Sequence, residues 1–387
     1  MNNFTYSYPV KVYFGKDTTE TALTTELKKY GKNVLLAYGG GSVKKNGVYD
    51  AVKGILEKEG KTVFDFSGIM PNPTYAKVQE GAKMAKENNI DFILAVGGGS
   101  VIDCCKIVSA QALEEKNLWE MEFDQGTYPS NFLPMGAIVT ASGTGAEMNN
   151  GAVITNEERK IKGGMLGAFA DFAVLDPELT MSLPMKQVIS GAFDTLSHCM
   201  ETYFGQPQED NLSDDINEAI MKSVIQNIRT LLKDEKNYHA RSELMWASAM
   251  GENGILKIGK VTDFQAHQIE HQLGAYTDCN HGQGLAVIHP TLYRHIYKEA
   301  AGKFARFAKE VWGISGEGKS DEQTAAEGID ALEAFIKEIG MPSTLKEMGI
   351  KDKEMLRKVA DSSNVTAGCC KKLTADEIFE ILEECAE

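Results

Sequence analysis

The sequence predicts a two-domain protein, with an N-terminal α/β domain built on a doubly wound, mostly parallel sheet and an all-α C-terminal domain. Its 387 residues exceed the size at which a single hydrophobic core stops growing. Short apolar runs alternate with helical periodicity in the first half, whereas long amphipathic stretches fill the second half. We place the boundary near residue 180, which gives domains over 1–180 and 181–387.

The strands of the N-terminal domain are predicted from continuous apolar runs. Such runs indicate strands that are buried on both faces, as in a parallel sheet covered by helices. Helices are expected over about 43–58 and 75–87, with Pro71-Asn-Pro73 breaking the chain before the second. The expected strands are Asn33–Tyr38, Thr62–Phe66, Asp91–Val96, Gly136–Thr140 and Phe172–Asp176.

The second half is predicted to be helical because its apolar side chains recur at helical spacing. The expected helices span about 186–204, 214–233, 240–254, 300–311 and 321–339.

The composition excludes several classes of partner. Asp and Glu outnumber Lys and Arg by 55 to 40, and the net charge of −15 repels nucleic acids and anionic membranes. The seven cysteines, including the neighbours Cys104/Cys105 and Cys369/Cys370, have no disulfide-framework or zinc spacing, which favours a reducing compartment. Residues 1–8 lack the features of a secretory signal, and no apolar stretch is long enough to cross a bilayer. We therefore expect a cytoplasmic protein without nucleic-acid or membrane partners.

Two expected strands end in the same glycine-rich turn. Gly39-Gly40-Gly41-Ser42 follows the first strand, and Gly97-Gly98-Gly99-Ser100 follows the third. Glycines let the backbone approach a ligand, and free N–H groups at the start of the next helix bind phosphate. The carboxyl ends of parallel strands are also where ligands bind in an open α/β sheet. The paired turns indicate a phosphate-binding site, although such turns can also serve only to tighten packing.

A third loop, Thr140–Gly145, also follows a strand. Its hydroxyl and backbone groups are suited to holding ribose, diphosphate or nicotinamide groups, and the alternative is a loop that only turns the chain. None of the three loops has the Gly-x-Gly-x-x-Gly fingerprint of the common dinucleotide fold.

The C-terminal half contains a cluster of potential metal ligands. Asp194 and His198 are four residues apart, as are His267 and His271, so each pair lies on one face of a helix, and His281 follows. One carboxylate and two or three imidazoles suit Zn²⁺ or Fe²⁺ better than Mg²⁺ or Ca²⁺.

A peptidase is an alternative interpretation of one of these motifs. His267-Gln-Ile-Glu-His271 matches the His-x-x-Glu-His pattern of inverted zinc peptidases, with Glu270 as the base. That interpretation leaves the glycine turns and Asp194 unexplained.

Taken together, these motifs resemble the iron-containing (group III) alcohol dehydrogenases, and among them the NADPH-dependent butanol dehydrogenases and aldehyde reductases. The resemblance covers nearly the whole chain. It is carried by Tyr38–Lys45, Pro71–Pro73, Gly97–Asp103, Val174–Pro177 and the set of Asp194 with the four histidines.

The resemblance implies a dinucleotide-binding domain over 1–180 and a metal-binding domain over 181–387. It also implies four metal ligands, Asp194, His198, His267 and His281, with His271 as a non-ligand histidine that relays a proton. Lys160 matches a lysine near the nicotinamide, with Lys162 as the alternative. Ala146 departs from the family's loop pattern, because many members have a serine there.

The expected cofactor contacts come from the three loops and the segments that follow them. They are Gly39, Gly40, Gly41, Ser42, Lys45, Gly97, Gly98, Gly99, Ser100, Asp103, Thr140, Thr144, Asn149 and Lys160. NADP(H) is preferred, with NAD(H) possible, because Gly39 stands where NAD-preferring relatives tend to have an Asp that repels a 2′-phosphate. Lys44 and Lys45 supply positive charge nearby.

The resemblance implies an alcohol dehydrogenase or aldehyde reductase that moves a hydride between NAD(P)H and small aliphatic aldehydes and alcohols. One divalent metal, Fe²⁺ or Zn²⁺, would activate the substrate oxygen. The protein is expected to be a homodimer. The alternatives are a related lyase or polyol(-phosphate) dehydrogenase, which would need a basic pocket, and a nucleotide-binding protein without catalysis.

Overall fold

The computed structural model describes residues 2–365, 368 and 370–387. The chain divides into two compact units. One comprises Ser7–Pro184, and the other comprises Met185–Glu387 with the N-terminal segment up to Tyr6. Each unit has its own fold.

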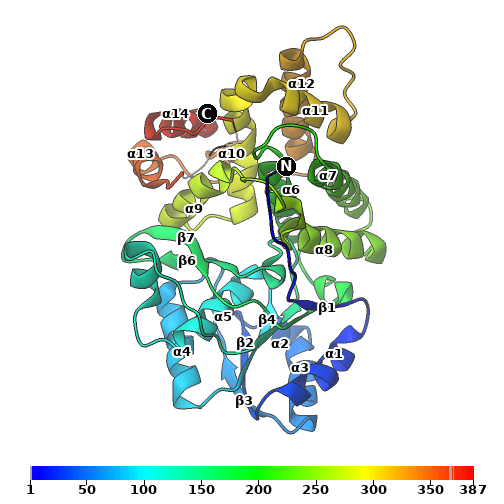
Figure 1. Ribbon diagram of the computed structural model, residues 1–387. Helices are drawn as coiled ribbons and strands as arrows, with labels where there is room; N and C mark the ends of the chain where they lie inside the picture. Colours follow the sequence, from blue (N-terminus) through cyan, green and yellow to red (C-terminus); the bar gives the residue numbers. More distant parts are fainter. Residues whose placement is uncertain (1, 366–367, 369) are drawn as a thin grey trace. The chain divides into compact units, whose positions relative to one another are not determined.

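The first unit is built on a six-stranded parallel sheet (Figure 1). Its strands run in the order β1-β8-β5-β4-β2-β3, so the direction of winding reverses between β2 and β4. In a doubly wound sheet this switch point is where ligands bind, at the carboxyl ends of the strands. The strands are β1 Lys11–Phe14, β2 Asn33–Tyr38, β3 Thr62–Phe66, β4 Phe92–Gly97, β5 Met135–Val139 and β8 Phe172–Leu175.

Helices cover both faces of this sheet (Figure 1). Helices α1 (Thr18–Glu26) and α3 (Val48–Lys58) bury Leu23 and Leu56 against one face, where they join Leu36 and Leu94 in the core. Helices α4 (Tyr75–Glu87) and α5 (Gly99–Gln111) pack together on the other side. The predicted fold class of this half is confirmed.

The predicted helix over 43–58 was wrong as a single element. The structure has a short helix α2 (Ser42–Lys45) and then α3, separated by Asn46 and Gly47. Gly47 has φ +82°, which is left-handed and cannot continue a right-handed helix. The Asn46-Gly47 pair is a turn signal, but the prediction followed the apolar residues on either side of it.

Several elements were not predicted. Strand β1 lies at the sheet edge and pairs in parallel with β8. An antiparallel hairpin, β6 (Gly151–Asn156) and β7 (Ile161–Leu166), forms a separate two-stranded sheet. Both are short or glycine-containing, so they lack the long apolar runs that identified the central strands.

The second unit is helical, as predicted. Among the described residues, no helix combines the length and apolar character needed to cross a lipid bilayer. The helices are α6 Met185–Tyr203, α7 Leu212–Leu231, α8 Tyr238–Glu252, α9 Gln265–Thr277, α10 His281–Ile296, α11 Ala301–Trp312, α12 Asp321–Glu338, α13 Lys353–Ser362 and α14 Ala375–Ala386.

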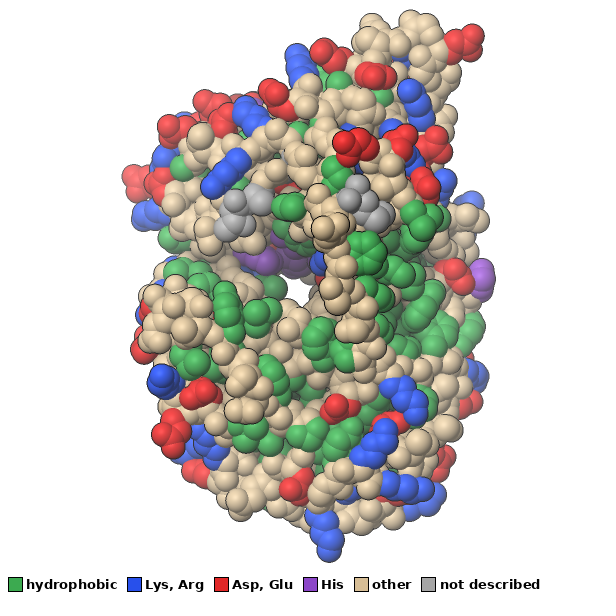
Figure 2. Space-filling model, viewed as in Figure 1, with side chains coloured by type: hydrophobic (Ala, Val, Ile, Leu, Met, Phe, Trp, Pro, Cys, Tyr) green, Lys and Arg blue, Asp and Glu red, His purple; other side chains and the backbone are tan. Residues whose placement is uncertain are grey.

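The structure shows where the charged side chains and the cysteines lie. On the face drawn in Figure 2, acidic and basic side chains are interspersed over the helices of the C-terminal unit. Among the described cysteines, all are free thiols, and Cys104, Cys105, Cys199 and Cys385 are buried. Cys369 lies outside the described residues.

Candidate metal centre and dinucleotide loops

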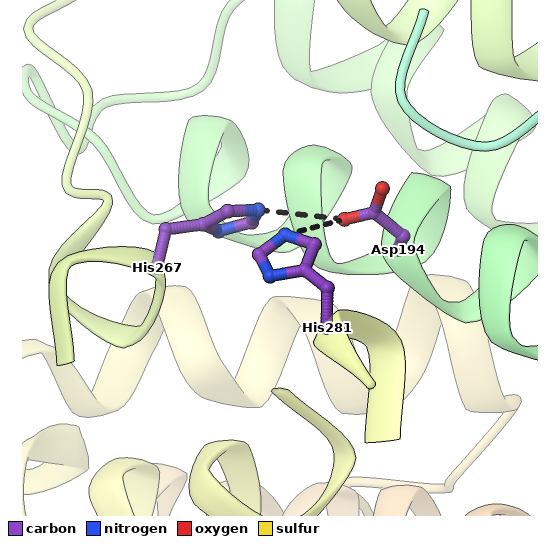
Figure 3. Close-up of side chains that lie close together, drawn as sticks. All are labelled: Asp194, His267 and His281. Carbon is purple, nitrogen blue, oxygen red and sulfur yellow. Dashed lines mark ion pairs between the residues drawn. The ribbon is translucent and has the colours of Figure 1, made fainter. Parts of the chain in front are cut away.

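Three helices of the C-terminal unit bring imidazoles to one carboxylate. Asp194 and His198 lie one turn apart on α6, His267 is on α9, and His281 is the first residue of α10. The Nε2 atoms of His198, His267 and His281 lie 3.6, 3.5 and 3.4 Å from Asp194 Oδ1. Figure 3 shows Asp194, His267 and His281 pointing toward one another.

The chemistry of this donor set fits a divalent cation. One ligand atom from each of Asp194, His267 and His281 lies within 4.8 Å of the others. Asp194 Oδ1 and His267 Nε2 are buried without a hydrogen-bond partner among the described residues, an arrangement that is costly unless a cation or proton is shared there. One carboxylate oxygen with imidazole nitrogens suits Fe²⁺ or Zn²⁺.

Buried carboxylates hydrogen-bond the other ring nitrogen of two of these histidines and lie near that of the third. Glu201 hydrogen-bonds His267 Nδ1, and Glu270 hydrogen-bonds His281 Nδ1. Glu252 Oε1 lies 3.8 Å from His198 Nδ1. A carboxylate on Nδ1 fixes the ring and leaves Nε2 available as a ligand, as is usual for histidines that bind metals. Glu201 and Glu252 were not predicted, and Glu270 was considered only as the base of the peptidase alternative.

Burial and neighbouring charges shift the pKa values of the groups in this cluster. Burial by itself would raise the pKa of Asp194, but the facing imidazoles of His198 and His281 hold it well below its ordinary value. Burial by itself would lower the pKa of His267, but Glu201 and Asp194 raise it to about 10. Burial lowers the pKa of His198. A cation that binds here must compete with protons for these nitrogens.

His271 lies beside the cluster rather than on Asp194. It is buried on α9, and its ring centroid is 5.5 Å from that of His281 and 5.9 Å from that of His267. One ligand atom each from Glu270, His271 and His281 also lies within 4.8 Å of the others.

Glu270 has a different role from that of a peptidase base. Its side chain is fully buried, and its carboxylate holds the His281 ring. A general base must instead reach a water or substrate proton. The glutamate of the His-x-x-Glu-His motif therefore orients a histidine of the next helix, His281.

The second glycine turn is packed against the Thr140–Gly145 loop. Gly97 ends β4, and α5 begins at Gly99. A Cβ at Gly99 would lie only 2.4 Å from Thr144 Oγ1, and one at Gly98 would lie 3.0 Å from the Ala141 Cβ. The structure thus brings together two of the predicted loops, with no room for side chains at the glycines.

The first glycine turn leads into a much shorter helix. Gly41 has φ +106°, and α2 ends after one turn at Lys45, which is exposed. The Lys44 Nζ lies 4.9 Å from the Tyr38 ring centroid and 4.5 Å from that of Tyr49. Positive charge is therefore held close to this turn.

Asp103 and Asn149, both predicted as cofactor contacts, meet at a buried lysine that was not predicted. Lys106 Nζ donates to Asn149 Oδ1 at 2.9 Å and to the Gly151 carbonyl at 2.6 Å, and it lies 3.4 Å from Asp103 Oδ1. The spacing Asp103–Lys106 was visible in the sequence, but the link to residue 149 depends on the fold.

The two candidate nicotinamide lysines lie in different environments. Lys160 is exposed in the turn between β6 and β7, with φ +54°. Lys162 is buried on β7 and is only 4% exposed.

Comparison with known proteins identifies the family. Residues 9–177 match the family described as iron-containing alcohol dehydrogenase, and residues 188–386 match the C-terminal domain of the Fe-containing alcohol dehydrogenase family.

Similar proteins span nearly the full chain. The probable NADH-dependent butanol dehydrogenase 1 of Bacillus subtilis is 40% identical over 99% of both chains. The NADPH-dependent aldehyde reductase YqhD of Escherichia coli is 34% identical, also over 99% of both. The crystal structure of NADH-dependent butanol dehydrogenase A from Thermotoga maritima superposes with a TM-score of 0.94 and 34% identity, covering 100% of this chain and 99% of that one.

The chain belongs to the iron-containing alcohol dehydrogenase family, in the branch of butanol dehydrogenases and aldehyde reductases. It is a metal-dependent alcohol dehydrogenase or aldehyde reductase that acts on small-molecule alcohols and aldehydes. Family membership implies a nicotinamide dinucleotide and a divalent metal, typically iron.

Proposed function

We propose that the enzyme interconverts short aliphatic aldehydes and alcohols, with NADP(H) as the hydride carrier and one divalent cation. The proposed ligands are Asp194, His198, His267 and His281. The observation that supports them is the convergence of three imidazole Nε2 atoms on Asp194 Oδ1 at 3.4–3.6 Å. Iron is favoured by the family, and zinc fits the same donors.

The cation would supply Lewis-acid stabilisation of charge on the substrate oxygen. The protein's own groups have the remaining tasks. Glu201 and Glu270 hold the rings of His267 and His281 in place. His271, buried beside His281, would transfer the proton that the substrate oxygen gains or loses.

The three loops of the first unit would bind the dinucleotide, with their glycines next to its phosphates. Relatives of both kinds, NADH-dependent and NADPH-dependent, match this chain, so the preference for NADPH rests on its own residues. Gly39 offers no carboxylate to repel a 2′-phosphate, and Ser42, Lys44 and Lys45 supply donors nearby. We propose Lys162 for the nicotinamide contact, because Lys160 lies in an exposed turn.

The first experiment follows the oxidation of NADPH and NADH with butanal, using protein stripped of metal and then restored with Fe²⁺ or Zn²⁺. We expect activity only after metal is restored, and faster turnover with NADPH. Turnover by metal-free protein would exclude the proposed metal role, and faster turnover with NADH would exclude the cofactor preference.

Substitutions in the same assay separate ligands from the proton relay. His267→Ala should lose bound metal and activity together, whereas His271→Ala should keep the metal and lose about 10²-fold in kcat. His239→Ala, on an 81% exposed side chain, is the control and should change neither. Loss of metal in His271→Ala would make His271 a ligand instead.

We also propose a homodimer, which sedimentation analysis would test.

A further inference from the structure

Phe264 has a backbone conformation that its side chain disfavours. It is the residue before α9, with φ 57° and ψ 21°. This is the left-handed region, which is uncommon for bulky residues and which glycine adopts freely. An aromatic residue at this position therefore needs a reason.

Hydrogen bonds on both sides of Phe264 enforce this conformation. The Glu201 carbonyl accepts from the Asp263 N–H at 3.2 Å, and Glu201 Oε1 accepts from the Ala266 N–H at 2.7 Å. Gln265 Nε2 donates to Asp263 Oδ1 at 2.9 Å. The fold thus fixes the left-handed turn through the same Glu201 that holds His267, but none of these contacts requires an aromatic side chain.

The Phe264 ring lies beside two of the proposed ligands. Its centroid is 5.1 Å from that of His267 and 6.0 Å from that of His198. Lys257 Nζ lies 4.9 Å from the ring centroid and is held by Glu252 at 2.9 Å. Phe264 is half-buried, so the residue is not enclosed in the core.

We infer that Phe264 is a specificity-determining residue, an apolar wall beside the ligands that favours aldehydes with unsubstituted alkyl chains over hydroxylated ones. This role rests on the proposed function. Residues held in disfavoured conformations cluster at functional sites, where the surrounding structure enforces them. A substrate that reacts at these ligands has its alkyl chain next to them, where the aromatic ring beside His198 and His267 offers apolar contact. A hydroxyl group there would lose hydrogen bonds to water.

The test compares propanal with glycolaldehyde, which have the same number of heavy atoms and differ in a methyl or hydroxyl group. We expect wild-type enzyme to prefer propanal. Phe264→Gly and Phe264→Ala should lower the propanal-to-glycolaldehyde ratio of kcat/KM about tenfold, mainly through KM for propanal, with bound metal unchanged. Phe264→Leu, which keeps an apolar side chain, should retain most of the preference.

Two comparisons separate selectivity from structural support. Phe379 on α14 is also half-buried, with the Arg357 guanidinium 5.3 Å from its ring centroid, so Phe379→Ala is a matched control that should keep the wild-type ratio. Phe264→Gly should have a Tm at least as high as that of Phe264→Ala, because glycine relieves the left-handed turn.

The role is overturned if both Phe264 variants stay active with a ratio within twofold of wild type. It is also overturned if they lose metal or lose both substrates equally, since Phe264 would then only support the ligands. A wild-type enzyme that reduces no aldehyde with either cofactor would instead overturn the proposed function, and this role with it.

Discussion

Buried carboxylates determine where the histidine nitrogens of the candidate metal centre point. Glu201 and Glu270 are fully buried, and each binds the Nδ1 atom of a proposed ligand, His267 or His281. The ring orientation is therefore fixed before any cation arrives, which limits the entropy lost when one binds.

Glu270→Gln should weaken metal binding about 10–100-fold, because the amide is a poorer partner for the Nδ1–H of His281. Competition with a chelator measures this affinity. Glu243→Gln is the control, since Glu243 makes only a 4.0 Å surface pair with His239. Equal affinities for the two variants would show that the Glu270 contact does not tune the metal site.

At the residue scale, the sequence predicted the residues with recognisable spacing and missed those brought together by folding. Asp194 and His198 are four residues apart, which is a direct helical signal. Glu201 and His267 are 66 residues apart, and Lys106 and Asn149 are 43 apart, so no local pattern joins them. The left-handed turn at Phe264 also leaves no trace in residue type, because an aromatic side chain argues against it.

At the scale of elements, the start of α5 packs closely against the Thr140–Gly145 loop because the glycines there have no side chains. The Cβ that an alanine at position 99 would carry comes within 2.4 Å of Thr144 Oγ1. Either the helix start or the loop must then move.

Gly99→Ala should lower the free energy of unfolding by about 1–3 kcal/mol, the usual cost of overpacking. Gly40→Ala, whose Cβ would meet nothing within 4 Å, should change it by less than about 0.5 kcal/mol. Denaturant unfolding of the two variants measures both. A Gly99→Ala protein as stable as wild type would mean that the helix start and the loop can move apart without a loss of stability.

Element prediction succeeded where burial was continuous. Strands Asn33–Tyr38 and Thr62–Phe66 are confirmed residue for residue, whereas the strands predicted at Asp91–Val96 and Gly136–Thr140 lie one residue away, at Phe92–Gly97 and Met135–Val139. The break at Gly47 and the β6–β7 hairpin were missed, because apolar periodicity does not report backbone conformation or a separate small sheet.

At the scale of the whole molecule, the proposed metal ligands all lie in the unit that begins at Met185, and the glycine loops all lie in the unit that ends at Pro184. The proposed dinucleotide site and the proposed metal site therefore draw on residues of different compact units. A bound dinucleotide or metal raises the free energy of unfolding only if its own binding site is intact.

Thermal unfolding should show this separation. NADPH at about 100 times its Kd should stabilise wild type by about 2.7 kcal/mol, and metal should add its own increment. In His267→Ala the increment from metal should vanish while that from NADPH remains. Loss of both increments would mean that the His267 substitution also disrupts the nucleotide loops.

The junction at Pro184–Met185 also bears on how such enzymes diversify. The residues proposed to bind the dinucleotide and those proposed to bind the metal are encoded on opposite sides of one point in the gene. A single recombination there would exchange the proposed dinucleotide loops and leave the proposed metal ligands unchanged. Chimeras of this chain with full-length relatives, joined at this junction, would take their dinucleotide loops from one parent and their metal ligands from the other.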